Sequence, residues 1–444
     1  MVSWSIRFTF YKKTSNNMQK RIITLCVALC LTTSLFSQSF NGKLGYGVSP
    51  VGHPTDYSQF GTFLLEVANT CNGGAVMANG SWRDNIANSG NIPTLQKTIA
   101  QLQPVPYNYT DILVFGWATY PTLYLNTNND STNNWTNSTM RNLFIKTLVH
   151  AADSLNPAYI FIGNEVNFYF AQDSSDYANW ASFYSMAYDS IKFYSPTTKV
   201  GTIFNYEHLS GQGINTGWNT PLWNALLDLD TSKMDIVGLT LYPFFNAQQA
   251  NSVSLNYLDA LFSKIGNIPL AITETGWPGD SLYGNWNASP QEQVDWVNKL
   301  FNILNGRNVE VVNWLFLNYM MDNSNTPESL IFKSIAMRDS IGNDRPAFSV
   351  WQSYCPATSL NENTYTEEQV KIYPNPAANN FTLQIDNFKN EQCDLKISDL
   401  LGREVKQIQI TDPKTEITIA NLPDGIYFYQ LKNNTGKLII QQKK

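Results

Sequence analysis

The stretch Pro269-Leu270-Ala271-Ile272-Thr273-Glu274-Thr275-Gly276-Trp277-Pro278 decides the fold of the chain. Its apolar run is typical of a strand buried on both faces of a parallel sheet, and it ends at a lone carboxylate followed by the turn residues Gly and Pro. A second stretch, Ala158-Tyr159-Ile160-Phe161-Ile162-Gly163-Asn164-Glu165-Val166-Asn167, repeats the arrangement. Glu274 and Glu165 are therefore both expected at the end of a strand.

Eight strand-like apolar runs of this kind recur along the chain, with helical stretches between them. The residues at their C-terminal ends are Val48, Asn79, Gly116, Glu165, Phe204, Leu241, Glu274 and Trp314. These ends lie 31 to 49 residues apart, close to the ~30 or more residues of one strand-helix unit. The stretches Ser138–Leu155 and Ser289–Leu304 carry helix-period apolar residues after Ser caps. Eight such units predict an α/β fold, a (β/α)8 TIM barrel over residues 40–356.

The alternative to a barrel is an open, doubly wound sheet. Such a sheet usually carries a glycine-rich phosphate loop after its first strand. The corresponding segment, Gly45-Tyr46-Gly47-Val48-Ser49-Pro50, does not extend into that fingerprint. The barrel is therefore the favoured fold.

Composition and charge narrow the class of ligand. The chain has 444 residues, with 29 Lys and Arg against 35 Asp and Glu. This mildly acidic balance gives no electrostatic reason to expect nucleic acid or an anionic membrane as a partner. Its three histidines, His53, His150 and His208, are not spaced as metal ligands. We expect a monomer that acts on a neutral ligand without a metal or another cofactor.

The N-terminal residues 1–38 read as a secretory signal, with Met18 as the expected start. Basic residues precede an apolar stretch from Ile22 to about Leu35, which is shorter than the ~20 residues that span a bilayer. The mature chain then keeps three cysteines, Cys71, Cys355 and Cys393. An odd number argues against a dense disulfide framework and leaves open a single bridge, with Cys71 and Cys355 as the candidate pair.

The pattern changes near the C-terminus. Residues 357–369 are polar and predict a linker, and residues 370–444 show short alternating strands separated by turns, typical of a small antiparallel β-sandwich. The segments Ile372-Tyr373-Pro374-Asn375-Pro376, Leu400-Leu401-Gly402-Arg403-Glu404-Val405 and Leu422-Pro423-Asp424-Gly425-Ile426-Tyr427 resemble the C-terminal sorting domain of the Bacteroidetes type IX secretion system. This resemblance implies a secreted or cell-surface protein that engages the secretion machinery. A carbohydrate-binding sandwich is the alternative. The predicted strands of residues 370–444, however, lack the row of exposed aromatic residues that a sugar-binding platform requires.

The two glutamates carry the functional hypothesis. Carboxyl ends of barrel strands share one mouth, so Glu165 and Glu274 are expected to face one cavity. Paired carboxylates there are typical of glycoside hydrolysis. The segments Gly163-Asn164-Glu165-Val166 and Glu274-Thr275-Gly276-Trp277-Pro278 resemble those of clan A glycoside hydrolases, most closely family 17, the endo-β-1,3-glucanases, and next family 53, the endo-β-1,4-galactanases. The eighth strand departs from family 17 because it lacks a Phe-Asp-Glu-Asn ending.

The resemblance implies a role for each residue. Glu165 would be the acid/base and Glu274 the nucleophile of a retaining mechanism, which needs carboxyl groups ~5–5.5 Å apart. Asn164 would bond the sugar 2-hydroxyl, and Tyr242 and Arg83 would donate hydrogen bonds to Glu274. Two further residues, Trp277 and Trp314, are expected to stack on sugar rings.

Each residue also has a purely structural interpretation. A strand-end glutamate is often a loop salt bridge or a helix cap, Tyr242 could pack at the barrel rim, and Arg83 could pair with a neighbouring aspartate. Together, the residues predict a secreted retaining glycoside hydrolase that acts on a β-linked polysaccharide, with β-1,3-glucan first and β-1,4-galactan second. A glycan-binding barrel without turnover and a cell-wall transglycosylase are the alternatives.

Overall fold

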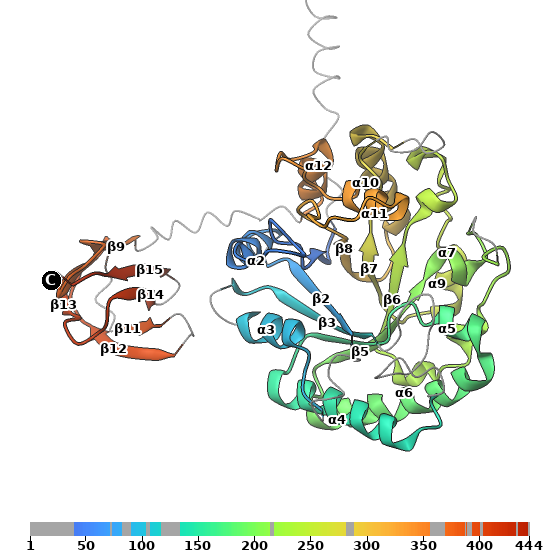
Figure 1. Ribbon diagram of the computed structural model, residues 1–444, viewed down its shortest axis with the longest axis horizontal. Coiled ribbons are helices and arrows are strands. Elements are labelled where there is room, and N and C mark those ends of the chain that lie inside the picture. Colours follow the sequence, from blue (N-terminus) through green and yellow to red (C-terminus); the bar gives the residue numbers. More distant parts are fainter. Residues whose placement is uncertain are drawn as a thin grey trace, which may run out of the picture. The chain divides into compact units, whose positions relative to one another are not determined.

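The N-terminal unit is a closed barrel of eight parallel strands, as the sequence predicts (Figure 1). The computed structural model describes residues 40–71, 73–81, 90–103, 107–116, 134–213, 217–280, 288–355, 369–386, 388, 393–399, 403–431 and 434–442. The strands are β1 (Lys43–Gly47), β2 (Ala75–Ser81), β3 (Thr110–Gly116), β4 (Tyr159–Ile162), β5 (Lys199–Asn205), β6 (Ile236–Leu241), β7 (Leu270–Thr275) and β8 (Val309–Trp314). Each strand pairs with the next, and β1 closes the ring by pairing with β8. All eight predicted strands are confirmed.

Helices surround this barrel on its outer side (Figure 1). The α-helices are α2 (Phe60–Ala68), α3 (Thr94–Leu102), α4 (Ser138–Leu155), α5 (Asn167–Gln172), α6 (Ser174–Tyr194), α7 (Tyr206–Ser210), α8 (Asn224–Leu227), α9 (Asp259–Ile265), α10 (Pro290–Leu304), α11 (Pro327–Ser334) and α12 (Pro346–Ser353). Short 3-10 turns span Thr231–Lys233, Pro243–Phe245 and Ala250–Ser252. Ser289 caps α10 as predicted, whereas the cap of α4 is Asn137 and not Ser138.

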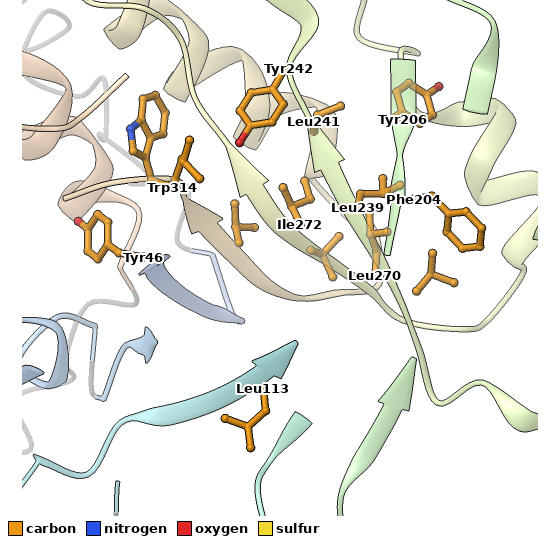
Figure 2. Close-up of a cluster of buried hydrophobic side chains, with 14 of the residues drawn as sticks. Tyr46, Leu113, Phe204, Tyr206, Leu239, Leu241, Tyr242, Leu270, Ile272 and Trp314 are labelled. Carbon is orange, nitrogen blue, oxygen red and sulfur yellow. The ribbon is translucent and has the colours of Figure 1, made fainter. Parts of the chain in front are cut away.

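Strand side chains alternate between the barrel interior and the layer beneath the helices. The interior cluster contains Ala75, Met77, Ile112, Val114, Tyr159, Phe161, Ile203, Ile236, Ala271 and Val311. Their strand neighbours, such as Leu239, Leu241 and Ile272, belong to the larger cluster that also contains the buried helix residues (Figure 2). This alternation is what a barrel requires, because successive strand residues point to opposite faces of the sheet.

Strand β7 departs from strict alternation at one residue. Ala271 faces the interior and Ile272 faces the helices, so a regular strand would also turn Glu274 toward the helices. The register with β6 instead skips Thr273, so that Thr240 of β6 pairs with Glu274. The extra residue reverses the alternation, and Glu274 lies on the interior side at the strand's carboxyl end.

The C-terminal unit is a small antiparallel sandwich. Its strands are β9 (Gln369–Tyr373), β10 (Asn380–Asp386), β11 (Cys393–Ser398), β12 (Glu404–Ile410), β13 (Lys414–Thr418), β14 (Gly425–Leu431) and β15 (Asn434–Ile440). They form one sheet in the order β13-β10-β9 and a second in the order β12-β11-β14-β15. Apolar residues from both sheets share one core. Contacts divide the whole chain into residues 1–357 and 358–444.

Two other expectations concern the chain ends and membranes. The predicted signal, residues 1–38, and nearly all of the predicted linker, residues 357–369, lie outside the described residues. In the parts of the chain that the structure describes, no helix is both long enough and apolar enough to cross a bilayer.

The structure settles the pairing of two cysteines that the sequence left open. Cys71, between α2 and β2, forms a disulfide with Cys355, just after α12, and the bridge closes a separation of 284 residues. Cys393 is buried in the core of the sandwich. The backbone N–H of Phe40 also donates to the carbonyl of Tyr354 at 2.8 Å. The bridge therefore links the beginning and the end of the barrel chain.

Replacing both bridge cysteines, Cys71 and Cys355, by serine should destabilise the barrel. The bridge restricts a very long loop in the unfolded chain, so its loss should cost about 2–4 kcal/mol. Denaturant unfolding followed by tryptophan fluorescence measures this cost. A reductant should lower the stability of the wild-type protein and leave the double variant unchanged; equal sensitivity of the two proteins would contradict the prediction.

Candidate active site

Glu274 lies at the carboxyl end of β7 with two hydrogen-bond donors. The Tyr242 hydroxyl, from the residue after β6, donates to Glu274 Oε2 at 3.0 Å. The side chain of Asn79, on the interior side of β2, donates a second hydrogen bond. The sequence predicts the donor role of Tyr242, and the structure places its hydroxyl at this carboxylate.

Glu165 reaches the same mouth through an unusual backbone conformation. It follows β4 with a φ of 52°, in the left-handed region that residues other than glycine rarely adopt, and Gly163 before it has a φ of 88°. Hydrogen bonds fix this turn on both sides, because Gly163 N–H donates to Phe115 O at 2.9 Å and Val166 N–H donates to Ile203 O at 3.0 Å. A conformation of this kind costs about 1–2 kcal/mol and often occurs at functional sites.

Two side chains from β5 and β6 hold the Glu165 carboxylate. Thr240 Oγ1 donates to Glu165 Oε1 at 2.6 Å, and Asn205 Nδ2 donates to the same oxygen at 3.1 Å. Thr240 is also the ladder partner of Glu274. One threonine is therefore bonded to the first glutamate and paired in the sheet with the second, so both carboxyl groups meet at one side of the barrel mouth.

The two carboxyl groups influence each other electrostatically. Burial and the nearby charge of Glu165 raise the pKa of Glu274 to about 7, and the hydrogen bonds from Tyr242 and Asn79 oppose that increase. Burial also raises the pKa of Glu165, against the hydrogen bonds from Thr240 and Asn205. Each negative charge disfavours the ionisation of the other group, so the pair loses its two protons in two separate steps as the pH rises. In the pH range between those steps, the two carboxyl groups hold a single proton.

A third carboxyl group, Glu207 in α7, lies beside this pair. Its side chain is fully buried. Glu207 Oε1 accepts hydrogen bonds from the backbone N–H of Tyr242 at 3.1 Å and from the Tyr257 hydroxyl at 3.2 Å. Burial raises the pKa of Glu207 to about 7, and the charge of Glu165 contributes to the increase.

The remaining predicted residues occupy different positions. Asn164 precedes Glu165, and its buried Oδ1 has no hydrogen-bond partner among the residues that the structure describes. Trp277 is 1% exposed and packs against Phe244 and Trp296. Trp314 is fully buried. These positions place Trp277 and Trp314 in the packed layer of the barrel wall, where a sugar ring has no access to them.

Trp314 faces away from the barrel interior because of the alternation of side chains along β8. Its indole N–H donates to Ile335 O at 2.7 Å, and its ring meets Trp351 of α12 edge to face. Figure 2 shows Trp314 among the buried apolar side chains. Arg83, the other predicted donor to Glu274, lies outside the described residues.

Sequence reasoning gave no site role to three donors that hold the carboxyl groups, Asn79, Asn205 and Thr240, or to the neighbouring Glu207. The signal for Asn205 and Glu207 was present, because the apolar run ending at Phe204 is followed by Asn205-Tyr206-Glu207, the same apolar-to-polar change that identified the other strand ends. Thr240 was hidden inside the apolar run of β6. Its role follows only from the interior-facing alternation of that strand.

Two family models match the chain. Residues 117–318 match Glycosyl hydrolase family 53, and residues 371–442 match the Secretion system C-terminal sorting domain. The first match contains both Glu165 and Glu274, and it is the second of the two families that the sequence analysis named; nothing in the comparisons supports the expectation that placed family 17 and β-1,3-glucan first. The second match agrees with the predicted sorting domain and indicates a secreted or cell-surface protein.

Individual relatives are more distant. The chain is 25% identical over 176 residues to an arabinogalactan endo-beta-1,4-galactanase of Thermothelomyces thermophilus, an alignment that covers 36% of this chain and 52% of that protein. The chain thus spans about half the length of this curated relative. The solved structure of the exo-beta-1,4-mannosidase Op5Man5 from Opitutaceae bacterium strain TAV5 superposes with a TM-score of 0.53 at 11% identity, over 72% of this chain and 61% of that one. This structural likeness confirms the barrel fold.

Changing Tyr242 to phenylalanine should raise the pKa of Glu274 further above its value of about 7. The variant keeps the ring but removes the hydroxyl that favours the ionised carboxylate. A ¹³C NMR titration of glutamate carboxyl groups measures the change. Tyr257→Phe is the matched control, because that hydroxyl donates to Glu207 and not to Glu274. A Glu274 pKa that is equal in wild type and Tyr242→Phe would refute the assigned hydrogen bond.

Proposed function

The barrel carries a Glycosyl hydrolase family 53 domain, and from this premise we propose that the protein is an endo-acting, retaining glycoside hydrolase that cleaves β-1,4-linked galactan outside the cell. The observation that carries the proposal is the carboxyl pair at the barrel mouth, Glu165 and Glu274, each held by its own donors. The galactan assignment rests on the matched family and on the name of the fungal relative.

Glu274 is the proposed nucleophile. Its ionised carboxylate attacks the anomeric carbon, and the bond from that carbon to the departing sugar oxygen breaks. The Tyr242 hydroxyl at 3.0 Å favours the ionised form of Glu274 before the attack. The product of this step is a glycosyl ester on Glu274 and a shortened chain with a new free hydroxyl.

Glu165 is the proposed acid and base. It gives its proton to the departing oxygen in the first step, and the resulting carboxylate takes a proton from water in the second, so that the hydroxide equivalent attacks the anomeric carbon and frees Glu274. Thr240 and Asn205 hold the carboxyl group in both protonation states, because each donates to Glu165 Oε1. The proton that Glu165 loses is therefore restored at the end of each cycle.

Asn164 is the proposed contact for the sugar beside the bond that breaks. A buried acceptor without a partner is costly, and Asn164 Oδ1 is such an acceptor in the free protein. Asn164 as a whole is only half-buried, so a 2-hydroxyl of the bound sugar would contact its side-chain amide, and this contact strengthens as charge develops on the ring.

The C-terminal unit supports the proposed location. Its match to a sorting domain covers residues 371–442, nearly the whole sandwich. We therefore assign it delivery through the secretion machinery and no part in hydrolysis. An external enzyme meets polymeric substrate that cannot enter the cell, which is consistent with cleavage inside a long chain.

Glu165→Ala and Glu274→Ala should each abolish most activity on galactan. Loss of the acid/base should lower kcat about 10²–10⁴-fold, and loss of the nucleophile should lower it by about 10³-fold or more. Reducing-sugar release from galactan and laminarin measures turnover and linkage together. The matched control is Glu328→Ala, an exposed glutamate in the first turn of α11, which should keep full activity.

Three outcomes would decide against the proposal. Turnover of laminarin but not galactan would overturn the substrate assignment. Binding of glycans without hydrolysis would favour a binding barrel, and full activity in either glutamate variant would overturn the assigned pair.

The first product released should have the same β configuration as the bond that is cut. Two successive displacements at the anomeric carbon, one by Glu274 and one by water, restore the original configuration. ¹H NMR during the first minutes of galactan hydrolysis distinguishes the new β reducing end from the α form that appears later by mutarotation. An α reducing end that appears first would show that a single displacement operates and that Glu274 is not the nucleophile.

A further inference from the structure

Glu207 has no role in the two-step reaction described above, although it contacts Tyr242 and interacts electrostatically with Glu165. It is the second residue of α7, which begins directly after β5. Asn205 caps this helix through its Oδ1, which accepts from the backbone N–H of His208 at 3.0 Å, and the Nδ2 of the same residue donates to Glu165. The segment that fixes Glu207 therefore also holds the proposed acid.

The contacts of Glu207 lead to the proposed nucleophile as well. Glu207 Oε1 accepts the backbone N–H of Tyr242 at 3.1 Å, and the hydroxyl of that same tyrosine donates to Glu274 Oε2 at 3.0 Å. The Tyr257 hydroxyl, which donates to Glu207 Oε1, itself accepts from Asn246 Nδ2 at 2.7 Å. One tyrosine thus connects Glu207 to Glu274 through its backbone on one side and its ring on the other.

The two oxygens of Glu207 are not equivalent. Among the described residues, Oε1 receives two donors, whereas Oε2 is buried and has no hydrogen-bond partner. In the described part of the chain, the titratable groups that interact with Glu207 are Glu165, Tyr206, Tyr242 and Tyr257, and each of them is either neutral or negative. The neighbouring His208 is neutral too, because burial lowers its pKa to about 4. None of these groups supplies a positive charge that would favour an ionised Glu207.

An ionised Glu207 would therefore be a buried charge without a compensating cation and beside a second carboxylate. A carboxyl group in such a place keeps its proton to higher pH than one in water. A protonated Glu207 still offers Oε1 as a carbonyl acceptor to both of its donors, and it places its proton on Oε2, the oxygen that accepts no hydrogen bond. The contacts fit the neutral acid better than the carboxylate.

We propose that Glu207 is a positioning residue of this active site. As a neutral acid it anchors Tyr242, and through Tyr242 it holds Glu274. Its ionisation at higher pH extends the pH range over which Glu165 keeps its proton. This inference rests on the proposed hydrolase function, since Glu207 is not expected to touch the substrate.

The direction of the pH effect follows from the sign of the charges. The charge of Glu165 raises the pKa of Glu207, and electrostatic coupling is reciprocal, so a negative Glu207 raises the pKa of Glu165. When Glu207 ionises as the pH rises, its negative charge delays the loss of the Glu165 proton that the first step needs. Removing the ability of Glu207 to ionise must therefore move the alkaline limb of the pH profile toward lower pH.

Glu207→Gln tests this because glutamine has the shape and the acceptor of the neutral acid and cannot ionise. On galactan, the variant should keep kcat within about twofold at pH 5.5, and its alkaline limb in kcat/KM should lie lower by about half a pH unit or more. Glu292→Gln is the matched control: Glu292 Oε2 also accepts a backbone N–H after β6, from Ala250 at 2.7 Å, but it has no contact with the carboxyl pair in the described structure. The profile of this control should superpose on that of the wild type.

Two results would overturn the proposal. If the pH profile of Glu207→Gln superposes on that of the wild type, Glu207 is a structural residue only. If folded Glu207→Gln is inactive at every pH, the ionised form is the one required, and the neutral acid is the wrong assignment.

An infrared measurement separates this proposal from the proposed hydrolase function. In wild type and in Glu292→Gln at pH 6, the C=O stretch of a buried protonated carboxyl group should include a component that is missing in Glu207→Gln. Its presence in all three proteins would refute a protonated Glu207, whatever the substrate. If that component behaves as expected while the wild-type protein cleaves no galactan, the substrate assignment fails and the neutral Glu207 stands.

Discussion

Two carboxyl groups that share one buried barrel mouth repel each other and both lose hydration, and the surrounding structure is arranged to offset that cost. Each carboxylate receives two donors: Thr240 and Asn205 for Glu165, and Tyr242 and Asn79 for Glu274. Hydrogen bonds to charged groups contribute about 1.5–3 kcal/mol each, more than those between neutral groups. These donors carry no charge, so they do not force both carboxyl groups to ionise. The pair can therefore hold a single proton, as a proton donor beside an ionised nucleophile requires.

The backbone deviates from regular barrel geometry at the places that deliver these carboxyl groups. Glu165 adopts a φ of 52°, and β7 contains the bulge at Thr273 that turns Glu274 inward. Both deviations disturb regular backbone geometry, the first through a strained φ and the second through an unpaired ladder position. A regular β7 would have buried Glu274 against the helices, where the hydroxyl of Tyr242 could not reach it. Local irregularity and function therefore occur at the same residues.

The sequence predicts the strands well and the direction of individual side chains less well. Apolar runs and their spacing identify all eight barrel strands, because burial on both faces leaves a continuous apolar signal. Trp314 and Trp277 also stand at predicted strand ends, but their rings point into the layer beneath the helices. Whether a strand-end side chain faces the mouth depends on alternation and on bulges, and a bulge such as that at Thr273 has no mark in the amino-acid sequence. Thr240 escapes prediction for the same reason, because nothing in the apolar run of β6 marks it as the residue that faces Glu165. Asn205 and Glu207, by contrast, follow an apolar-to-polar change that the sequence does show.

The hydrogen-bond donors of the two glutamates come from distant parts of the chain, and the disulfide joins two of those parts. Strands β4 to β7, with the turns that follow them, provide both glutamates and most of their donors, while β2 contributes Asn79. The β8–β1 pairing gives the shorter of the two routes by which the closed sheet joins β2 to β7, so closure of the ring helps to hold Asn79 near Glu274. The bridge between Cys71 and Cys355 lies at that closure, where it joins the segment before β2 to the segment after α12. Outside the cell a disulfide persists, so a covalent link is available where the geometry of the site depends on two distant parts of the chain staying together.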